Sequence, residues 1–427
     1  MIYNNLDFNK KTILITGGAG FIGSNLAHYF QENFPKSRVV VFDCFRSDEI
    51  FPNGNLKSYG HYKNLNGFVG DIICGNINNQ ADLRLLSNYK FDYIFHQAAI
   101  SDTRVYDQEI IMKTNVNSFY DLLSIAKKDS SVMVYASSAA TYGSLPSPQT
   151  VGKEQPENPY GYSKYAMDKI ADRYRSLNDD INIVGLRYFN VYGHNEFYKG
   201  KTASMIIQLG QQILNGNAPK LFENSNEIFR DFIHIDDVVQ ANIRACNANG
   251  TYNVGTGKPR SFQDISDILQ NELETDLGTE YFANPFNGYQ TNTNANISES
   301  KKDFGFVPNI SLEDGIKQYL PEIKWFNKLS NKESAEEELD VSYTGDDLEI
   351  GFNINYVQDS LNYQGTKKEK RLVQKRAQFD ICSYLTPLKN AACSKIFNVL
   401  KVWDQQSVPD EKFYKALYIL YLFLWLK

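Results

Sequence analysis

Three glycines at fixed spacing, Gly17, Gly20 and Gly23, constrain the fold of this chain more than any other feature. They follow the β-branched run TILIT and open a segment with helical character, NLAHYFQENF. In such a turn the first glycine permits the tight bend, the second lets backbone N–H groups approach a pyrophosphate, and the third allows close packing of helix on strand. Asp43 ends the next run, VVVFD, where a carboxylate meets the adenosine ribose. The pattern therefore predicts a dinucleotide-binding turn.

Short β-branched runs alternate with amphipathic segments from residue 11 to about residue 170, and INIVGLRY at 181–188 adds another strand. This alternation is typical of βαβ units with a parallel sheet. We expect an α/β protein: a Rossmann doubly wound parallel sheet, a smaller α/β substrate-binding domain and an unrelated C-terminal tail. The expected boundaries are 11–180 for the NAD(P)-binding domain, with 181–200 and about 226–260 returning to it, 200–329 mainly for the substrate domain, and 330–427 for an irregular tail.

Composition narrows the class of protein further. The 427 residues carry a formal net charge of −6, so no whole-protein field favours nucleic acid, and we expect no nucleic-acid partner. Five cysteines without a C-x-x-C pair argue against a disulfide framework or a thiolate metal site, and we expect no metal. The longest apolar run, 416–426, is far shorter than the roughly 20 residues that span a bilayer. These features predict a cytoplasmic protein without a membrane span.

A serine, a tyrosine and a lysine form the candidate catalytic set. Ser138 lies in VYASSAATYG, and Tyr160 precedes Lys164 by four residues in NPYGYSKYAMDK. On a helix, residues i and i+4 share a face, so the phenol and the ammonium can serve one site. A free tyrosine has a pKa near 10, and an adjacent cation favours its phenolate. The serine hydroxyl can then hydrogen-bond the reacting oxygen of a substrate.

The choice between NAD and NADP stays open on the residues alone. Asp43 favours a free ribose 2′-hydroxyl, whereas Arg46, three residues on, can neutralise a 2′-phosphate. Lys57 or Lys63 can assist Arg46, but each of these three cations fits a solvated loop position equally well.

The motifs TGGAGFIGSN, FHQAAISDTR, YASSAATYG, YGYSK and RYFNVYG resemble those of the extended short-chain dehydrogenase/reductases. The further segments PKLFENSNEIFRDFIHIDDV and YNVGTGKPRSF are similar to the ADP-heptose 6-epimerase family within that group, over residues 11–329. This resemblance implies NADP as cofactor, with NAD possible. Implied cofactor contacts are Gly17, Gly20, Phe21, Ile22, Gly23, Asp43, Cys44, Arg46, Lys57, Gln97, Ala98, Ala99, Ile100, Ser101, Asn115, Tyr160, Lys164 and Val191. Implied contacts to ADP-heptose are Asn190, Lys201, Gln208, Phe222, Glu223, Asn224, Ser225, Arg230 and Tyr289.

The reaction that the resemblance implies is inversion at C6 of the heptose of ADP-D-glycero-D-manno-heptose, for lipopolysaccharide inner-core synthesis. The hydrogen on C6 is not acidic, so the inversion is expected to run through a transient 6-keto intermediate. Tyr160 and Lys199 are the two implied acid/base groups, with Ser138 and Lys164 completing the catalytic set. On spacing alone, Lys199 fits a phosphate contact or a solvated loop residue. The family's habit implies a homo-oligomer, commonly a homopentamer.

Two rival interpretations use the same residues. A UDP-hexose 4-epimerase or a dehydratase shares Tyr160 and Lys164, although SSAATYG lacks the carboxylate pair that dehydratases usually carry there. A non-catalytic dinucleotide-binding protein would not need the serine, tyrosine and lysine. Lys201 and Gln208 depart from the family, since serine and histidine are common at these positions, which leaves the details of sugar binding open.

The tail has a different character. Residues 332–362 resemble part of the last domain of a bacterial DNA polymerase sliding clamp. A clamp needs several complete domains to close around DNA, so this fragment predicts a fusion rather than a replication function.

Overall fold

The computed structural model describes residues 3, 6–178, 181–284 and 290–333, with side chains as far as residue 328. The chain divides into two units, Met1–Glu336 and Glu337–Lys427, and the second unit lies entirely outside the described residues. The tail fragment at 332–362 therefore falls almost wholly outside them as well.

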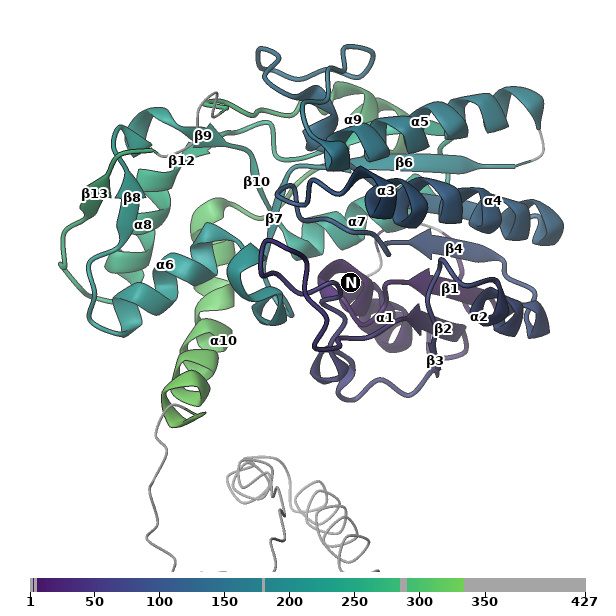
Figure 1. Ribbon diagram of the computed structural model, residues 1–427, viewed down its shortest axis with the longest axis horizontal. Helices are drawn as coiled ribbons and strands as arrows, with labels where there is room; N and C mark the ends of the chain where they lie inside the picture. The colour runs from purple at the N-terminus through teal and green to yellow at the C-terminus, as the bar shows by residue number, and fades with distance from the viewer. Residues whose placement is uncertain (1–2, 4–5, 179–180, 285–289, 334–427) are drawn as a thin grey trace, which may run out of the picture. The chain divides into compact units, whose positions relative to one another are not determined.

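A seven-stranded sheet in which all pairs are parallel forms the larger part of the first unit (Figure 1). The strand order is β3-β2-β1-β4-β5-β6-β11, which is the doubly wound order with the switch of direction beside β1. The predicted fold class is confirmed, and the runs TILIT, RVVVFD and VMVYASS are strands β1, β2 and β5. The strands are β1 (Thr12–Thr16), β2 (Arg38–Asp43), β3 (Asp71–Cys74), β4 (Tyr93–His96), β5 (Val132–Ser138), β6 (Ile183–Tyr188) and β11 (Gly250–Val254).

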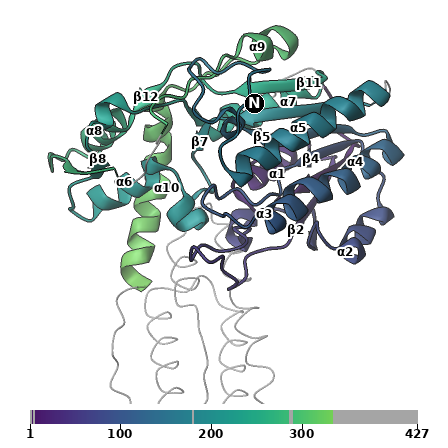
Figure 2. The ribbon, with the colours of Figure 1, turned by 45° about the horizontal axis from the view of Figure 1, so that its top comes forward.

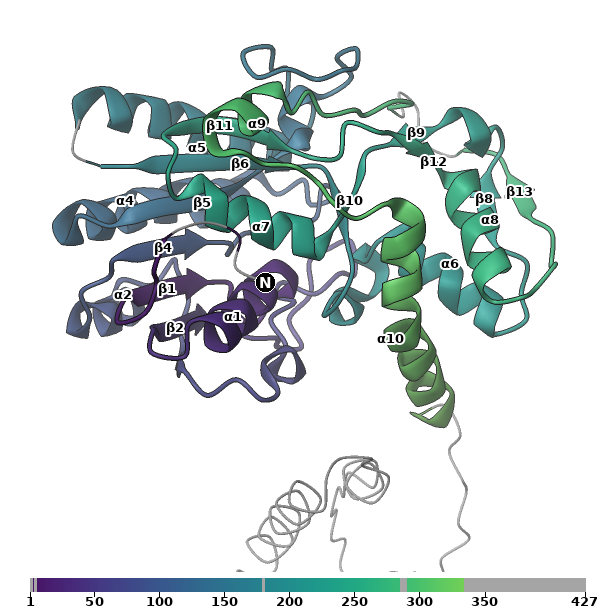
Figure 3. The ribbon, with the colours of Figure 1, turned by 180° about the vertical axis from the view of Figure 1, so that it is seen from behind.

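Helices cover both faces of this sheet because successive strand residues are apolar on both sides. Ile13 and Ile15 point into one core with helices α1 and α7, while Leu14 between them belongs to the opposite core with α4 and α5. Figure 3 shows α1 and α7 beside the sheet from behind. The helices of these layers are α1 (Phe21–Asn33), α2 (Gln80–Arg84), α3 (Gln108–Ile111), α4 (Ser118–Asp129), α5 (Pro159–Leu177), α7 (Ile235–Ala245) and α9 (Ser298–Phe304), and a π-helix, η3 (Met112–Asn117), joins α3 to α4.

A smaller region lies at one end of the sheet, where Figure 2 shows α6, α8 and α10 together. Its core contains Ile206 and Leu209 of α6, Leu269 of α8, and Tyr319 and Ile323 of α10. The sequence MIIQLGQQIL forms α6, and FQDISDILQNE forms α8. The elements of this region are α6 (Met205–Leu214), α8 (Phe262–Glu272), α10 (Leu312–Glu333), the parallel pairs β7 (Asn190–Tyr192) with β10 (Phe232–His234) and β8 (Lys220–Phe222) with β13 (Glu280–Phe282), and the antiparallel pair β9 (Phe229–Arg230) with β12 (Arg260–Ser261).

Several short helical turns contain or directly follow residues predicted for the site, such as Lys199 and Ser225. One of them directly follows β5 at the carboxyl edge of the sheet, which is where ligands bind in doubly wound folds, and two others follow β7 and β8 of the smaller region. These turns are η1 (Tyr62–Leu65), η4 (Ala139–Tyr142), η5 (Phe197–Thr202) and η6 (Ser225–Glu227), and a further turn, η2 (Leu85–Asn88), follows α2.

Candidate active site

The glycine turn between β1 and α1 leaves no room for side chains. Gly17 has a φ of 69°, and a Cβ there would lie 2.6 Å from the backbone nitrogen of Ala98. A Cβ on Gly23 would overlap the carbonyl oxygen of Gly17. Gly20 caps α1 without a side chain, and the first turn of α1 has no acidic residue. The turn therefore presents the N-terminus of a 13-residue helix to an anion, which fits the pyrophosphate of a dinucleotide.

Asp43 at the end of β2 is fixed by the backbone around this turn. One carboxylate oxygen accepts the N–H of Ala19 at 3.0 Å, and the other accepts the N–H of Phe45 at 2.8 Å. Burial raises the pKa of Asp43, and these backbone hydrogen bonds oppose the rise. A carboxylate has about four acceptor positions, so Asp43 can brace the turn and also accept from a ribose hydroxyl.

The other residues predicted after β2 have different surroundings. Arg46 is exposed, and its side chain borders a pocket described below. Lys57 is paired with Glu49 at 2.8 Å on the surface, which matches the solvated-loop alternative for this lysine. Cys44 is exposed and hydrogen-bonded to Ser58. The ammonium of Lys63 lies 5.9 Å from the ring centre of Tyr198. Of the predicted cations, Arg46 is the one that borders the pocket.

The loop after β4, Gln97–Ser101, is held by a buried asparagine. Asn115, which is 0% exposed in the π-helix η3, accepts the N–H of Ile100 at 2.9 Å and donates to the carbonyl of Ile100 at 3.0 Å. Its amide also donates to the hydroxyl of Ser163 at 2.9 Å. Asn115 thus connects the predicted cofactor loop to α5. Gln97 bonds Asn242 and Tyr188 on the far side of the loop, Ala98 and Ala99 are half-buried, and Ser101 is exposed.

Ser138, Tyr160 and Lys164 come together where β5 ends and α5 begins. Asn158 caps α5 by accepting the N–H of Gly161 at 2.8 Å, which sets Tyr160 in the first turn. Burial raises the pKa of Tyr160, and its hydrogen bond with Ser138 opposes the rise. The ammonium of Lys164 lies 6.0 Å from the centre of the Tyr160 ring and donates to the carbonyl of Ala136 at 2.7 Å.

Lys164 is the group in this set whose proton is most easily lost. It is 2% exposed, and this burial lowers its pKa to about 8, although the charge of Asp168 acts in the opposite direction. A phenol, a hydroxyl and a lysine with a lowered pKa are thus grouped where β5 ends and α5 begins, and groups of these kinds serve as general acids and bases. The arrangement can accept a proton from an alcohol or return one to a ketone.

A buried ionic network behind this set was not foreseen from the sequence. The guanidinium of Arg187 in β6 contacts Asp168 at 2.8 Å and Glu154 at 2.5 Å, and all three side chains are at most 5% exposed. The hydroxyls of Tyr135 and Ser137 also donate to Asp168. The one signal in the sequence is the position of Asp168, four residues after Lys164 on the same helix. Its partners come from other elements, and spacing does not reveal them.

Lys199 is carried by η5, on a different element from Tyr160. Its ammonium lies 5.4 Å from the ring centre of Phe21, the first residue of α1, and 3.8 Å from a carboxylate oxygen of Glu196. The two residues before it are held by aromatic stacking, Tyr198 on His61 and Phe197 on Phe326. The structure thus brings Lys199 to the start of α1, at the predicted pyrophosphate position.

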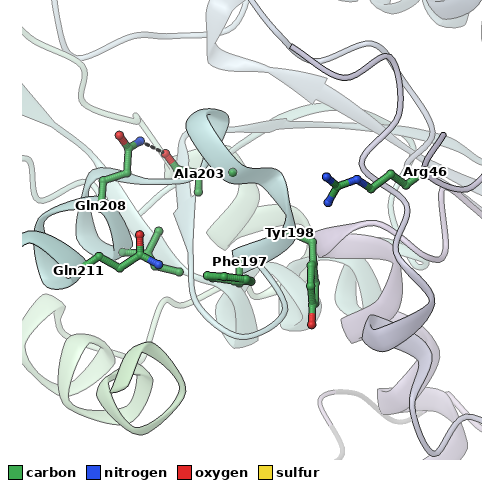
Figure 4. A pocket seen from close by; sticks show the side chains of 8 residues that line it. Arg46, Phe197, Tyr198, Ala203, Gln208 and Gln211 are labelled. Carbon is green, nitrogen blue, oxygen red and sulfur yellow. Dashed lines mark hydrogen bonds between the residues drawn. The ribbon is translucent and has the colours of Figure 1, made fainter. Parts of the chain in front are cut away.

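A pocket of about 250 Å³ lies beside this loop (Figure 4). Figure 4 shows Arg46 on one side of Tyr198 and the two glutamines of α6, Gln208 and Gln211, on the other. The amide nitrogen of Gln208 donates to the carbonyl of Ala203 at 2.6 Å. Predicted cofactor and substrate residues therefore border one cavity. Its lining residues are Arg46, Phe197, Tyr198, Gly200, Ala203, Ile207, Gln208 and Gln211.

Arg230 is buried at the border of β9 and β12. Its guanidinium is 5.6 Å from the ring centre of Phe262 and donates to the carbonyls of Phe229 at 2.8 Å and Gln290 at 2.5 Å. Ser225 is also buried, with its hydroxyl 3.4 Å from Gln263.

The remaining predicted substrate residues are spread around the smaller region. Asn190, Lys201, Glu223 and Asn224 are exposed, whereas Phe222 is half-buried at the end of β8. Val191, predicted for the cofactor, is half-buried in β7. Tyr289 lies outside the described residues.

The doubly wound sheet, the glycine turn and the serine, tyrosine and lysine set define a dinucleotide-dependent enzyme of the short-chain dehydrogenase/reductase class. More particularly, the chain belongs to the NAD dependent epimerase/dehydratase family, whose model matches residues 13–255. A nicotinamide dinucleotide is therefore the cofactor that the cradle around Gly17 and Gly23 fits.

Comparison with individual proteins agrees with this family. The chain is 36% identical over 318 residues to the ADP-L-glycero-D-manno-heptose-6-epimerase of Brachyspira hyodysenteriae, which covers 72% of this chain and 96% of that protein. The crystal structure of the ADP-L-glycero-D-manno-heptose-6-epimerase of Helicobacter pylori is similar with a TM-score of 0.70 and 48% identity, covering 76% of this chain and 99% of the other. The UDP-glucose 4-epimerase of Thermotoga maritima is similar with a TM-score of 0.66 and 26% identity, covering 75% and 99%.

A second family model matches the tail. This model describes the C-terminal domain of the beta chain of DNA polymerase III and matches residues 322–370, which confirms the resemblance predicted for 332–362. The match begins inside α10, and its part beyond residue 333 is outside the described residues. None of the helices that the structure describes has both the length and the apolar character needed to cross a bilayer.

Proposed function

We propose that this chain inverts C6 of ADP-D-glycero-D-manno-heptose to give the L-glycero epimer. The relatives from Brachyspira hyodysenteriae and Helicobacter pylori carry this activity in their names and match nearly their whole length. The structural observation that supports the proposal most is that the two side chains proposed as acid/base groups come from separate elements, Tyr160 from α5 and Lys199 from η5. An enzyme that oxidises a carbon from one face and reduces it from the other can use two such groups, one for each position of the C6 oxygen.

A nicotinamide dinucleotide held by the turn around Gly17, Gly20 and Gly23 would supply reversible hydride transfer at C6, so that the sugar passes through a 6-keto form. The protein's own part is to hold the sugar and to move the proton of the C6 oxygen. Tyr160, hydrogen-bonded to Ser138 and near Lys164, takes that proton in one epimer or gives it in the other. Lys199 performs the same task when the C6 oxygen lies on its side. No net oxidation of the sugar results.

NADP is the cofactor that we propose within the nicotinamide dinucleotides. The guanidinium of Arg46 borders the pocket and can pair with a 2′-phosphate through two parallel hydrogen bonds. Asp43 is already engaged by Ala19 and Phe45, so its position beside the ribose does not require a free 2′-hydroxyl. Lys57, paired with Glu49, is proposed as a minor contributor.

For the substrate, we propose that the buried Arg230 holds the diphosphate and that the turn after β8 holds the nucleoside. Arg230 lies against Phe262 in a setting of low polarity, which strengthens a hydrogen bond to phosphate. The proposed contacts around it are Asn190, Lys201, Gln208, Phe222, Glu223, Asn224, Ser225 and Tyr289. We further propose that the enzyme works in the cytoplasm as a homo-oligomer, in heptose supply for lipopolysaccharide.

Incubation of the full chain with ADP-D-glycero-D-manno-heptose, followed by NMR of the C6 proton, tests the proposal. We expect conversion to an equilibrium of the two epimers, and a fall of about 100-fold or more in kcat for Tyr160→Phe and for Lys199→Met. Conversion of UDP-glucose but not of ADP-heptose would instead favour the second candidate, a UDP-hexose 4-epimerase, to which the Thermotoga maritima structure is similar. Conversion of neither, with dinucleotide present, contradicts both.

A further inference from the structure

Glu196 is a buried carboxylate that the proposed reaction does not use directly. Its side chain is 0% exposed, directly before η5. It accepts the backbone N–H of Ser204 at 2.6 Å and the Ser204 hydroxyl at 2.8 Å, and a backbone hydrogen bond from Gly193 also reaches it. One carboxylate therefore ties together both ends of the segment from Gly193 to Ser204, in which Lys199 lies.

The charge of Glu196 is paired with Lys199. The ammonium lies 3.8 Å from the carboxylate, and the backbone N–H of Lys199 donates to the carbonyl of Glu196 at 3.0 Å, which sets the turn between them. Burial raises the pKa of Glu196, and the charge of Lys199 acts against that rise. Removing a charge from water costs several kcal/mol unless a partner is close. The pairing thus stabilises the ionised carboxylate inside the protein.

Further ionisable groups lie around the pair of Glu196 and Lys199, among them Glu322, Tyr319 and Lys201. On α10, Glu322 is bound to His194 at 2.8 Å and to the N–H of Asn195 at 3.0 Å. The phenol of Tyr319 has a pKa raised well above its usual value, by burial first and then by the charges of Glu196 and Glu322. Lys201 on η5 is exposed. Among the described residues, the ion pair formed by Glu196 is the one with Lys199.

We infer that Glu196 is the positioning residue for Lys199, fixing the loop that carries the lysine and supplying its counter-charge at the start of α1. A lysine has four rotatable bonds, and an acid/base group must be held within hydrogen-bond reach of its target. The ammonium of Lys199 lies 3.8 Å from the carboxylate of Glu196 and 5.4 Å from the ring centre of Phe21, so both side chains restrict it. This inference rests on the acid/base role that is proposed above for Lys199. The ion pair between Glu196 and Lys199 is a feature of the structure whether or not Lys199 has that role.

The substitution Glu196→Gln in the full chain removes the negative charge but keeps the shape of the side chain. The amide oxygen of glutamine can still accept a hydrogen bond from Ser204. Asp237→Asn is the matched control: Asp237 is also buried, and it accepts the N–H groups of Asn309 and Ile310. The readout is the rate of acetylation of Lys199 by acetic anhydride at one fixed pH, measured by mass spectrometry, with the exposed Lys301 as internal reference. The amine of Lys199 is held by its ion pair with Glu196, so the rate reports this restraint without any substrate.

We expect Lys199 to be acetylated several-fold faster in Glu196→Gln than in the wild type, because the amine has lost its partner, and at an unchanged rate in Asp237→Asn. In the epimerase assay, Glu196→Gln should lower kcat by ~100-fold with little change in KM, and the double variant with Lys199→Met should be no slower than Lys199→Met alone. An unchanged rate of Lys199 acetylation in a folded Glu196→Gln protein, or an equal increase in Asp237→Asn, overturns the inference. If the wild-type protein epimerises no heptose, the proposed function fails, and the acetylation rates still decide whether Glu196 restrains Lys199.

Discussion

Tyr198 of η5 and His61, the residue before η1, stack face to face, with ring centres 3.7 Å apart and planes 3° from parallel. This contact joins the loop after β2 to the loop that carries Lys199. His61 also accepts the N–H of Lys63 at 3.1 Å, so the ring cannot turn away from its partner without losing the cap of η1. The cofactor side and the substrate side of the site are therefore coupled through two rings.

Tyr198→Ala should weaken this coupling. Loss of an aromatic pair costs about 1 kcal/mol beyond the buried area. We expect a lower melting temperature and a lower kcat, since Lys199 is the next residue along. Tyr198→Phe keeps the ring and serves as the control, and it should stay close to the wild type in both measurements. Equal loss in both variants would show that the hydroxyl, not the stack, is what the loop needs.

The stability of the protein should fall between pH 6.5 and pH 4. Burial lowers the pKa of His96 to about 3 and, with the charges of Arg46 and Lys63, that of His61 to about 4. In this range the unfolded chain binds protons at these histidines and the folded chain does not, so acid favours unfolding by up to ~1.4 kcal/mol per pH unit for each. His194 acts the other way, because Glu322 raises its pKa.

Urea unfolding at several pH values measures this slope. His61→Phe keeps a ring against Tyr198 but cannot titrate, so its stability should decline less steeply than that of the wild type between pH 6.5 and pH 4. Parallel slopes for the two proteins would contradict the assignment of this acid sensitivity to His61.

Asp168→Asn should lower the stability of the protein more than most single substitutions in the sheet region. It removes the charge that faces Arg187 and leaves a buried guanidinium with Glu154 as its carboxylate partner, and breaking such a buried pair costs about 3–5 kcal/mol. Asp172, one turn further along α5, is exposed and pairs with Lys169 and Arg175, so Asp172→Asn should cost less than about 1 kcal/mol. Thermal unfolding of the two variants tests the difference, and comparable losses would refute it.

Arg46→Ala should change the selectivity for the cofactor. Without the guanidinium, binding of NADP should weaken by about tenfold or more, while binding of NAD should change little. Lys57→Ala is the comparison, and because Lys57 is paired with Glu49 on the surface we expect less than about a twofold effect on either dinucleotide. Titration calorimetry with both dinucleotides measures this. A larger effect at Lys57 than at Arg46 would show that the 2′-phosphate is assigned to the wrong cation.

Local patterns were enough to predict the glycine turn and the catalytic helix. Gly17 and Gly23 are required by backbone contacts that any strand–turn–helix of this kind makes, and the spacing of Tyr160 and Lys164 follows from the helix itself. Strand β3 was not predicted, because Asp71–Cys74 is short and its side chains alternate between half-buried and exposed. Its place in the sheet is set by pairing with β2.

Contacts between distant segments could not be predicted in the same way. The network of Arg187 with Asp168 and Glu154 joins three segments, and no spacing along the chain encodes it. Asn115 was assigned to the cofactor from the family resemblance, whereas the structure shows its amide engaged with Ile100 and Ser163. Whether it also reaches the cofactor stays a prediction.

Helix α10 sets a lower limit on how far this enzyme can be shortened. The family model ends at residue 255, yet Glu322 holds the backbone of Asn195, and Phe326 stacks on Phe197 with ring centres 3.7 Å apart. The clamp-like match starts at residue 322, within the same turns of helix. The clamp-like match thus begins inside the helix that supports the Lys199 loop, and a cut placed at the end of the first match or at the start of the second would remove that support.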